Sequence, residues 1–179
     1  MKKGRRCKVC KTYMESPRPN QVVCGYQCSF QYAKIQGEKK RKEKVKELKE
    51  SVKTKSDYLK EVQVVFNQFI RLRDEGKTCI SCGKEINGVR HASHYLSVGS
   101  SPSVRFNENN VWVSCYKCNV WLSGNQLEYR LRLIDKIGIE QVEQIESLSK
   151  QSVHYSIPEL IELKQVYKQK IKELQLKQI

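Results

Sequence analysis

Apolar residues recur at helical spacing in three parts of the chain, and the first of these covers about 57–75. Ser56 is a suitable N-cap for this helix, Asp57 stands in its first turn, and Gly76 is a suitable stop. Its apolar positions are Tyr58, Leu59, Val62, Val65, Phe66, Phe69 and Leu72. This pattern predicts an amphipathic helix that packs on the segment following it in the chain.

Two helices are predicted after the turn sequence Ser123-Gly124-Asn125. The first ends before Gly138, and the second is a short helix over 139–149. The apolar positions that support the first of them are Leu127, Leu131, Leu133, Ile134 and Ile137.

The last helical pattern begins with a capping box made of Ser156 and Glu159, with Pro158 in the first turn. Its apolar stripe consists of Leu160, Leu163, Tyr167, Ile171 and Leu174. The stripe can pack on the body of the protein or form a dimer seam, and it is too short to decide between the two.

Between these helices the pattern becomes that of strands. Val89 to Leu96 and Asn110 to Ser114 are predicted strands, joined by the polar loop Ser97 to Asn109. A helix is expected to begin around Cys115 to Asn119. Strands and helices together predict an α+β fold.

The segment 34–55 has almost no apolar residues and reads KIQGEKKRKEKVKELKESVKTK. Its Lys/Glu mixture favours helix, but no apolar stripe would hold that helix on a core. It can be a solvated helix, a flexible basic tether, or an arm that lies along phosphates. In the last case Lys39, Lys40, Arg41 and Lys42 are the candidate DNA contacts.

Composition narrows the class of protein. The 179 residues carry 34 Lys and Arg against 19 Asp and Glu, a formal charge of +15, which favours a polyanion such as nucleic acid or an anionic membrane face. No apolar run approaches the roughly 18 residues of a transmembrane helix, and the N-terminus lacks the apolar core of a signal peptide. We therefore expect a cytoplasmic protein that does not enter the membrane.

Eight cysteines fall into two sets of four, and spacing predicts a structural zinc site for each set. The N-terminal cysteine cluster is Cys7, Cys10, Cys24 and Cys28, in a segment of about thirty residues that has no sizeable core. The central cysteine cluster is Cys79, Cys82, Cys115 and Cys118. In a protein that is not secreted, such pairs favour metal binding over disulfides.

The histidines beside the central cluster are candidates for chemistry. His94 can act as a general base near neutral pH, while Asn119 and His91 can bind a catalytic Mg²⁺ or Mn²⁺ ion. The alternative is that the two histidines complete a zinc site. Arg105, in the loop between the strands, is a candidate phosphate contact.

The order Cys-x2-Cys, His, Asn, Cys-x2-Cys-Asn resembles the HNH, or ββα-metal, nucleases of the zinc-bearing treble-clef type. That resemblance implies that His94 is the general base, that Asn110 organises the loop between the strands as part of the catalytic motif, and that Asn119 binds the catalytic ion.

A narrower resemblance covers nearly the whole chain. The strings FIRLRDEGKTCISCG, HASHY, VRFNENN, CNVWLSGNQLEYRLRLIDKIG and HYSIPELIELKQVYKQKIKEL are similar to the phage lambda NinG (Rap) recombination protein family. The resemblance implies a phage-encoded endonuclease acting on Holliday junctions and D-loops. Its SGN-x3-YR string adds Asn125, Tyr129 and Arg130 as candidate DNA contacts, with the protein core as the alternative place for Tyr129.

Two departures from the family pattern stand out. Trp112 and Val113 occupy positions where a His and a Lys are expected, and His91 stands where relatives often have Asp. Activity is expected to survive, because His94, Asn110 and Asn119 are all present.

The sequence therefore predicts a zinc module over 1–32, a basic linker or helix over 33–56, an HNH-like nuclease domain over 57–150, and a C-terminal helix over 151–179. We expect metal-dependent cutting of branched DNA, with two structural zinc ions and no small-molecule cofactor beyond metal. Symmetric cleavage of a junction needs two active sites, so a homodimer is expected. The alternatives are a catalytically silent protein that binds branched DNA or recruits a partner, and an RNA-binding zinc protein.

Overall fold

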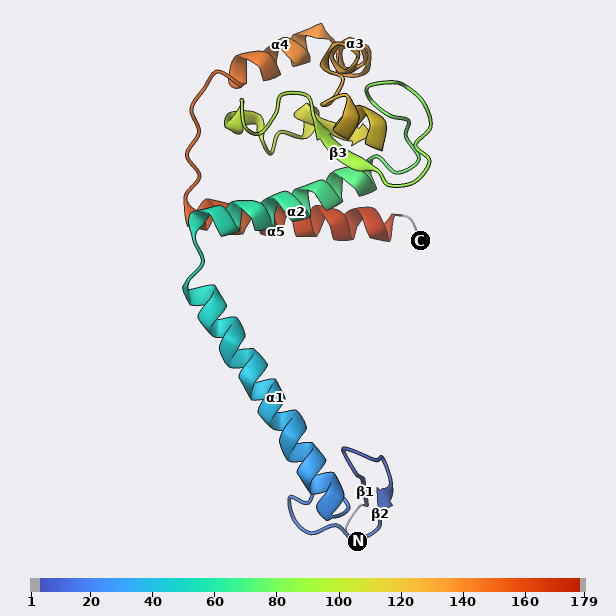
Figure 1. Ribbon diagram of the computed structural model, residues 1–179, viewed down its shortest axis with the longest axis vertical. Helices are drawn as coiled ribbons and strands as arrows, with labels where there is room; N and C mark the ends of the chain where they lie inside the picture. Colours follow the sequence, from blue (N-terminus) through green and yellow to red (C-terminus); the bar gives the residue numbers. More distant parts are fainter. Residues whose placement is uncertain (1–3, 178–179) are drawn as a thin grey trace. The chain divides into compact units, whose positions relative to one another are not determined.

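The computed structural model describes residues 4–177 and divides between Lys53 and Thr54 into two compact units (Figure 1). The expected zinc module and the basic segment share the first unit. The expected nuclease domain and the C-terminal helix share the second, so the helix over 151–179 is not a separate part.

The first unit holds a small antiparallel sheet and one long helix. Strands β1 (Arg5–Arg6) and β2 (Tyr13–Met14) pair antiparallel, and helix α1 spans Tyr26–Ser51. No residue of α1 is buried, so the basic segment is a solvated helix, and its contact with phosphates stays a prediction. The helix begins six residues before the expected boundary at 32, because it also carries Cys28 of the N-terminal cysteine cluster.

The second unit starts with helix α2 (Lys55–Arg73), whose N-cap is Thr54 and not the predicted Ser56. The backbone N–H of Thr54 donates to the Asp57 carboxylate at 2.9 Å, and the Asp57 N–H donates to the Thr54 hydroxyl at 3.4 Å. Ser56 cannot form this reciprocal pair, because the residue three positions on from it is not acidic. The capping box predicted at Ser156 and Glu159 is confirmed, and it opens helix α5 (Ile157–Leu176).

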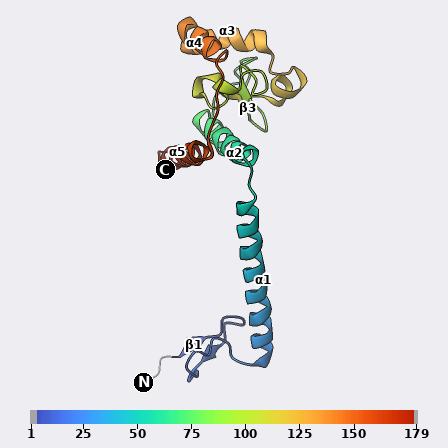
Figure 2. The same cartoon turned by 90° about the vertical axis from the view of Figure 1, so that its left-hand side faces the viewer.

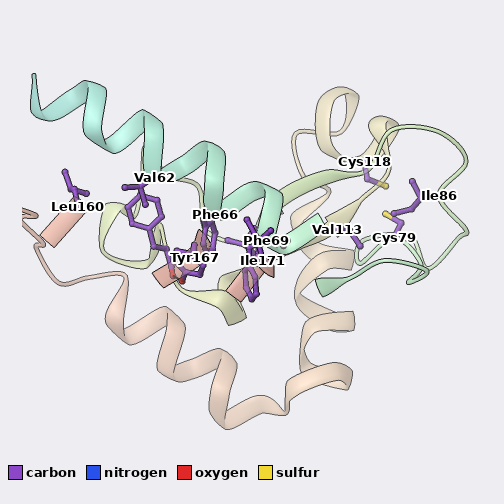
Figure 3. Packing of buried hydrophobic residues seen from close by; sticks show 13 residues of the cluster. Val62, Phe66, Phe69, Cys79, Ile86, Val113, Cys118, Leu160, Tyr167 and Ile171 are labelled. Atoms are coloured by element: carbon purple, nitrogen blue, oxygen red, sulfur yellow. Dashed lines mark hydrogen bonds between the residues drawn. The ribbon is translucent and has the colours of Figure 1, made fainter. Parts of the chain in front are cut away.

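Helices α2 and α5 lie side by side (Figures 1 and 2) and bury a shared aromatic core. The Phe66 and Tyr167 rings meet edge to face with centroids 4.9 Å apart. Val62, Phe69, Leu160 and Ile171 surround them (Figure 3). The apolar stripe of the last helix therefore packs on the body of the protein, which confirms the first of the two alternatives for this stripe.

Strands β3 (His91–His94) and β4 (Val111–Ser114) form a second two-stranded antiparallel sheet. The short helical turns η1 (Pro102–Val104) and η2 (Glu108–Asn110) lie in the connection between them. After β4, the turn η3 (Lys117–Trp121) is π-helical, so the helix expected here is a single wide turn.

The two faces of this sheet pack on different helices. Val111 and Val113 belong to the core that includes Phe66 of α2, whereas Trp112 packs against the core formed by helix α3. Side chains alternate between the faces of a strand, which explains why neighbouring residues of β4 join different cores.

Helices α3 (Gln126–Ile137) and α4 (Ile139–Leu148) confirm the two predicted helices. Leu133 of α3 is buried as expected, but Leu127 and Leu131 are exposed. Tyr129 is fully buried instead, and it packs together with Val142 and Ile145. No helix that the structure describes is both long enough and apolar enough to cross a membrane.

A buried carboxylate joins the end of α2 to β4. Asp74 is fully buried and accepts hydrogen bonds from the Arg73 guanidinium at 2.7 and 2.8 Å and from Lys77 Nζ at 2.8 Å. Its second oxygen also accepts from the Val113 backbone N–H at 3.3 Å. Burial alone would raise the pKa of Asp74, but the hydrogen bonds from Arg73 and Lys77 outweigh it and lower that pKa below its ordinary value.

Replacing Asp74 with alanine should destabilise the second unit by about 3 kcal/mol, because it leaves the Arg73 guanidinium without its counter-charge in a largely buried position. Thermal or urea unfolding measures this loss. Asp135→Ala removes the same charge from an exposed position and should change the free energy of unfolding by no more than about 0.5 kcal/mol. Equal effects of the two substitutions would contradict the role given to Asp74.

Candidate metal centres and active site

Each predicted set of four cysteines is gathered in space. Within each set all four sulfur atoms lie within 4.8 Å of one another, which suits one tetrahedral zinc ion per cluster. All eight cysteines are free thiols. Neither histidine belongs to a cluster, so the alternative that His91 and His94 complete a zinc site is not observed among the described residues.

Backbone N–H groups prepare one thiol of each cluster as a thiolate. Burial would raise the pKa of Cys79, but backbone N–H groups, including that of Cys115 at 3.3 Å from its sulfur, lower this pKa to about 7. Burial would also raise the pKa of Cys7, but backbone N–H groups outweigh this effect and lower the pKa of Cys7 to about 6. Because zinc binds the thiolate form, these donors favour metal binding at neutral pH.

The first Cys-x2-Cys turn of each cluster has the same backbone shape. The residue after the second cysteine has a positive φ, 64° for Lys11 and 70° for Gly83. Its N–H donates to the carbonyl of the first cysteine, at 3.1 Å for Cys7 and 2.8 Å for Cys79. The two modules therefore present their first two thiols in the same way, although Lys11 takes a conformation that glycine adopts more readily.

His94 is held in one tautomer by a backbone carbonyl. Its Nε2 lies 3.0 Å from the carbonyl oxygen of Arg105, and a carbonyl only accepts hydrogen bonds, so Nε2 must carry the proton. Nδ1 is therefore left with its lone pair. An apolar ring also lies near His94, with the Phe66 ring centroid 6.5 Å from that of His94.

The surroundings of His94 keep the imidazole neutral. Burial is the main cause that lowers the pKa of His94 below its ordinary value. The hydrogen bond to the Arg105 carbonyl raises this pKa in part, and the positive charge of Arg105 lowers it again. A neutral imidazole with a free Nδ1 can accept a proton from water at neutral pH.

Asn110 organises the loop that carries Arg105. It is fully buried; its side-chain oxygen accepts from the Leu96 N–H at 2.9 Å, and its amide nitrogen donates to the carbonyls of Leu96 and Val104 at 3.1 and 3.0 Å. All its side-chain contacts are therefore to the loop backbone. Asn110 therefore organises the loop between the strands, as the resemblance implies, and its part in catalysis stays a prediction.

His91 and His94 leave β3 on opposite faces, because they are three residues apart in a regularly paired strand. His91 lies beside the Tyr116 ring, with centroids 5.7 Å apart, and pairs across the sheet with Ser114. Its Nε2 and the Ser114 hydroxyl are buried without a hydrogen-bond partner among the described residues. The strand therefore does not support the prediction that His91 binds the ion on which His94 acts.

Asn119 lies in η3, immediately after the cluster residue Cys118. Its backbone N–H donates to the Cys115 carbonyl at 3.0 Å, so the central cysteine cluster fixes its place. Its side chain is partly buried and makes no hydrogen bond within the described part of the chain, which leaves its oxygen available as a ligand.

The candidate DNA contacts differ in what their side chains can still do. Tyr129 is fully buried, with its hydroxyl donating to the Ser93 carbonyl at 2.9 Å, so it belongs to the core and cannot contact DNA. Arg130 is paired with Glu146 at 2.8 Å and joins α3 to α4. Asn125 is a partly buried turn residue with φ 49° that begins α3. The SGN-x3-YR string is thus explained largely by the turn and the core.

The remaining candidates keep exposed charge. Arg105 donates from Nε to Gln63 at 2.8 Å but is only partly buried. The basic residues Lys39, Lys40, Arg41 and Lys42 are exposed on α1, and the ion pair from Lys39 to Glu43 is long at 4.0 Å. These side chains are free to meet phosphate.

Sequence reasoning missed the residues that hold the site in place. Arg73 donates to the carbonyls of Glu108 and Val111, at 2.9 and 2.8 Å, on either side of Asn110. Arg73 and Asp74 lie in the string FIRLRDEGKTCISCG, which belongs to the family resemblance. An adjacent Arg-Asp pair at the end of an amphipathic helix was the available signal, because burial of such a pair needs hydrogen-bond partners.

A family model and individual relatives of the chain point to the same protein family. Residues 1–177 match the NinG family, described as Bacteriophage Lambda NinG protein. The chain is 34% identical over 188 residues to protein ninG of Escherichia phage 933W, covering 95% of this chain and 93% of that protein. It is also 34% identical over 190 residues to the ninG proteins of Escherichia phage lambda and Salmonella phage P22, with the same coverage. No solved structure matches this chain.

The two cysteine clusters should each bind one zinc ion, so the chain isolated from zinc-replete cells should contain two. Cys7→Ser and Cys79→Ser should each lower the content to one, because a closed structural site needs all four ligands. Atomic absorption gives the stoichiometry. Cys79→Ser should lower the unfolding temperature of the second unit, whereas Cys7→Ser should leave it unchanged, because the two clusters belong to separate compact units. Zinc content that stays at two in either variant would refute the assignment.

Proposed function

The chain belongs to the bacteriophage lambda NinG family, and we propose that it is a metal-dependent endonuclease of the zinc-bearing ββα-metal type that cuts branched DNA. The proposed catalytic unit consists of β3, β4 and η3, with the central cysteine cluster as its scaffold. The observation that carries the proposal is the tautomer of His94, with Nε2 bound to the Arg105 carbonyl and Nδ1 free.

His94 is the proposed general base. Its lowered pKa keeps Nδ1 unprotonated at neutral pH, so it can take a proton from the water that attacks the phosphorus atom. As Nδ1 gains that proton, the Arg105 carbonyl faces an imidazolium and stabilises the charge through the Nε2 hydrogen bond. Asn110 supports this step indirectly, because it fixes the backbone from Leu96 to Val104 that precedes Arg105.

Asn119 is the proposed ligand for a divalent ion. Its side-chain oxygen suits Mg²⁺ or Mn²⁺, and such ions keep several waters and need few protein ligands. This fits the described residues, where the two cysteine clusters are the only groups of three or more Cys, His, Asp or Glu close enough to hold an ion. When bound, the ion offsets negative charge on the phosphate and on the leaving oxygen.

Positively charged side chains near His94 and on α1 favour the binding of DNA. The guanidinium of Arg105 lies close enough to His94 to lower its pKa, so a phosphate reaching the base also meets a cation. The exposed Lys and Arg residues of α1 add salt-dependent affinity for DNA backbone. A homodimer is proposed because a junction must be cut in two strands, although the apolar stripe of α5 is already packed within the chain.

Trp112 bears on whether catalysis survives in this chain. A His was expected at this position, but β4 places position 112 on the sheet face opposite His94. A ligand at 112 would therefore face away from the proposed base, and its replacement by Trp leaves the His94 face unchanged.

The second candidate function is a catalytically silent protein that binds branched DNA. The sparse oxygen ligands beside His94 favour it, since Asn119 is the only side chain we assign to the ion. The two functions differ in whether His94 matters for turnover.

His94→Ala should reduce cutting of a synthetic four-way junction by at least about a hundredfold while sparing junction binding, because it removes only the proton acceptor. The measurement is nicking with Mg²⁺ or Mn²⁺ together with gel-shift affinity. His154→Ala is the matched control, since His154 is exposed and carries no assigned role. Equal cutting by the wild-type chain and His94→Ala would favour the silent binding protein.

A further inference from the structure

A cavity of about 240 Å³ lies on the sheet face opposite His94, between the end of α2, the first turn of the central cysteine cluster, β4 and α3. Trp112 forms part of its wall, and Lys77, Arg132 and Lys136 contribute three cations. Its walls are held by a zinc-binding turn and a buried ion pair, so the pocket is a formed feature of the second unit.

Three cationic side chains lie close to the Trp112 ring. The Lys136 Nζ lies 4.8 Å and the Lys77 Nζ 5.4 Å from the ring centroid, and the Arg73 guanidinium lies 4.1 Å from it. Such cation–π contacts hold cations at a chosen place without neutralising them. The ring therefore keeps a cluster of positive charge at the wall of the pocket.

The negative charge in the pocket does not cancel these cations. Asp74 is already paired with Arg73 and Lys77, and it is fully buried. Asp135 is exposed and is the one other carboxylate in the lining. Neither Arg132 nor Lys136 makes an ion pair within the described residues. An anion in the pocket would thus meet two unpaired cations.

We propose that this pocket binds a backbone phosphate from a second arm of the branched DNA whose first arm is held at His94. This proposal rests on the proposed function and explains how the protein would select branched DNA as its substrate. His94 and Trp112 lie on opposite faces of one two-stranded sheet. A single straight duplex that lies along one face is not expected to reach the other, whereas the arms of a junction diverge and can meet both. Selectivity for branched DNA follows from this division of contacts.

The test is the affinity of the double variant Arg132→Gln/Lys136→Gln for a four-way junction and for a linear duplex of the same sequence. Binding is measured in the His94→Ala background without divalent ion, so that the result does not depend on cutting. Loss of this one phosphate contact should make the plot of log K against log salt shallower by about one for the junction. The duplex slope should change by less than about half of that. Thermal unfolding and zinc content check that the variant is folded.

Lys168→Gln/Lys172→Gln is the matched control, because it removes the same charge from exposed positions on α5. It should affect junction and duplex alike. A loss in the pocket variant that is equal for the two DNAs, or no larger than in the control, would overturn the proposal.

A fluorescence measurement distinguishes binding of the DNA junction in the pocket from binding of free inorganic phosphate. Trp121→Phe leaves Trp112 as the only tryptophan of the chain. The junction should change the Trp112 emission at concentrations where inorganic phosphate, at millimolar level, does not. A response to inorganic phosphate alone would identify a free-anion site and reject the second-arm contact.

Discussion

The buried carboxylate of Asp74 is the constraint on which the rest of the second unit depends. It holds Arg73 in place, and Arg73 in turn donates to the carbonyls of Glu108 and Val111 on either side of Asn110. Asn110 then fixes the loop that ends at Arg105. A charge with no exposure to water must have its partners in place, so one ionised group sets the position of the helix end, the strand and the loop together.

This chain of contacts explains why the proposed base is oriented without a neighbouring carboxylate. Many histidines that accept protons are oriented by an acidic side chain, but here the Arg105 carbonyl does it at 3.0 Å. The loop must therefore be rigid, and its backbone hydrogen bonds to Asn110 provide that. The central cysteine cluster contributes from the other side by fixing η3, which carries Asn119.

Features set by local spacing were predictable from sequence, and features set by tertiary packing were not. The cysteine clusters, the capping box at Ser156 and the helices around Gly138 follow from short patterns, and the structure confirms them. The cap at Thr54 and the burial of Tyr129 were missed or left open, because Ser56 and Thr54 are both capping residues and a tyrosine suits core and surface alike. The tautomer of His94 depends on a carbonyl eleven residues away, and no sequence pattern reports such a contact.

The most direct measurement is single-turnover nicking of a four-way junction by the wild-type chain, with a linear duplex of the same sequence as control and with Mg²⁺ or Mn²⁺ added or withheld. We expect cutting of the junction that requires the added ion, with little cutting of the duplex. Tight binding of the junction with no cutting under either ion would contradict it.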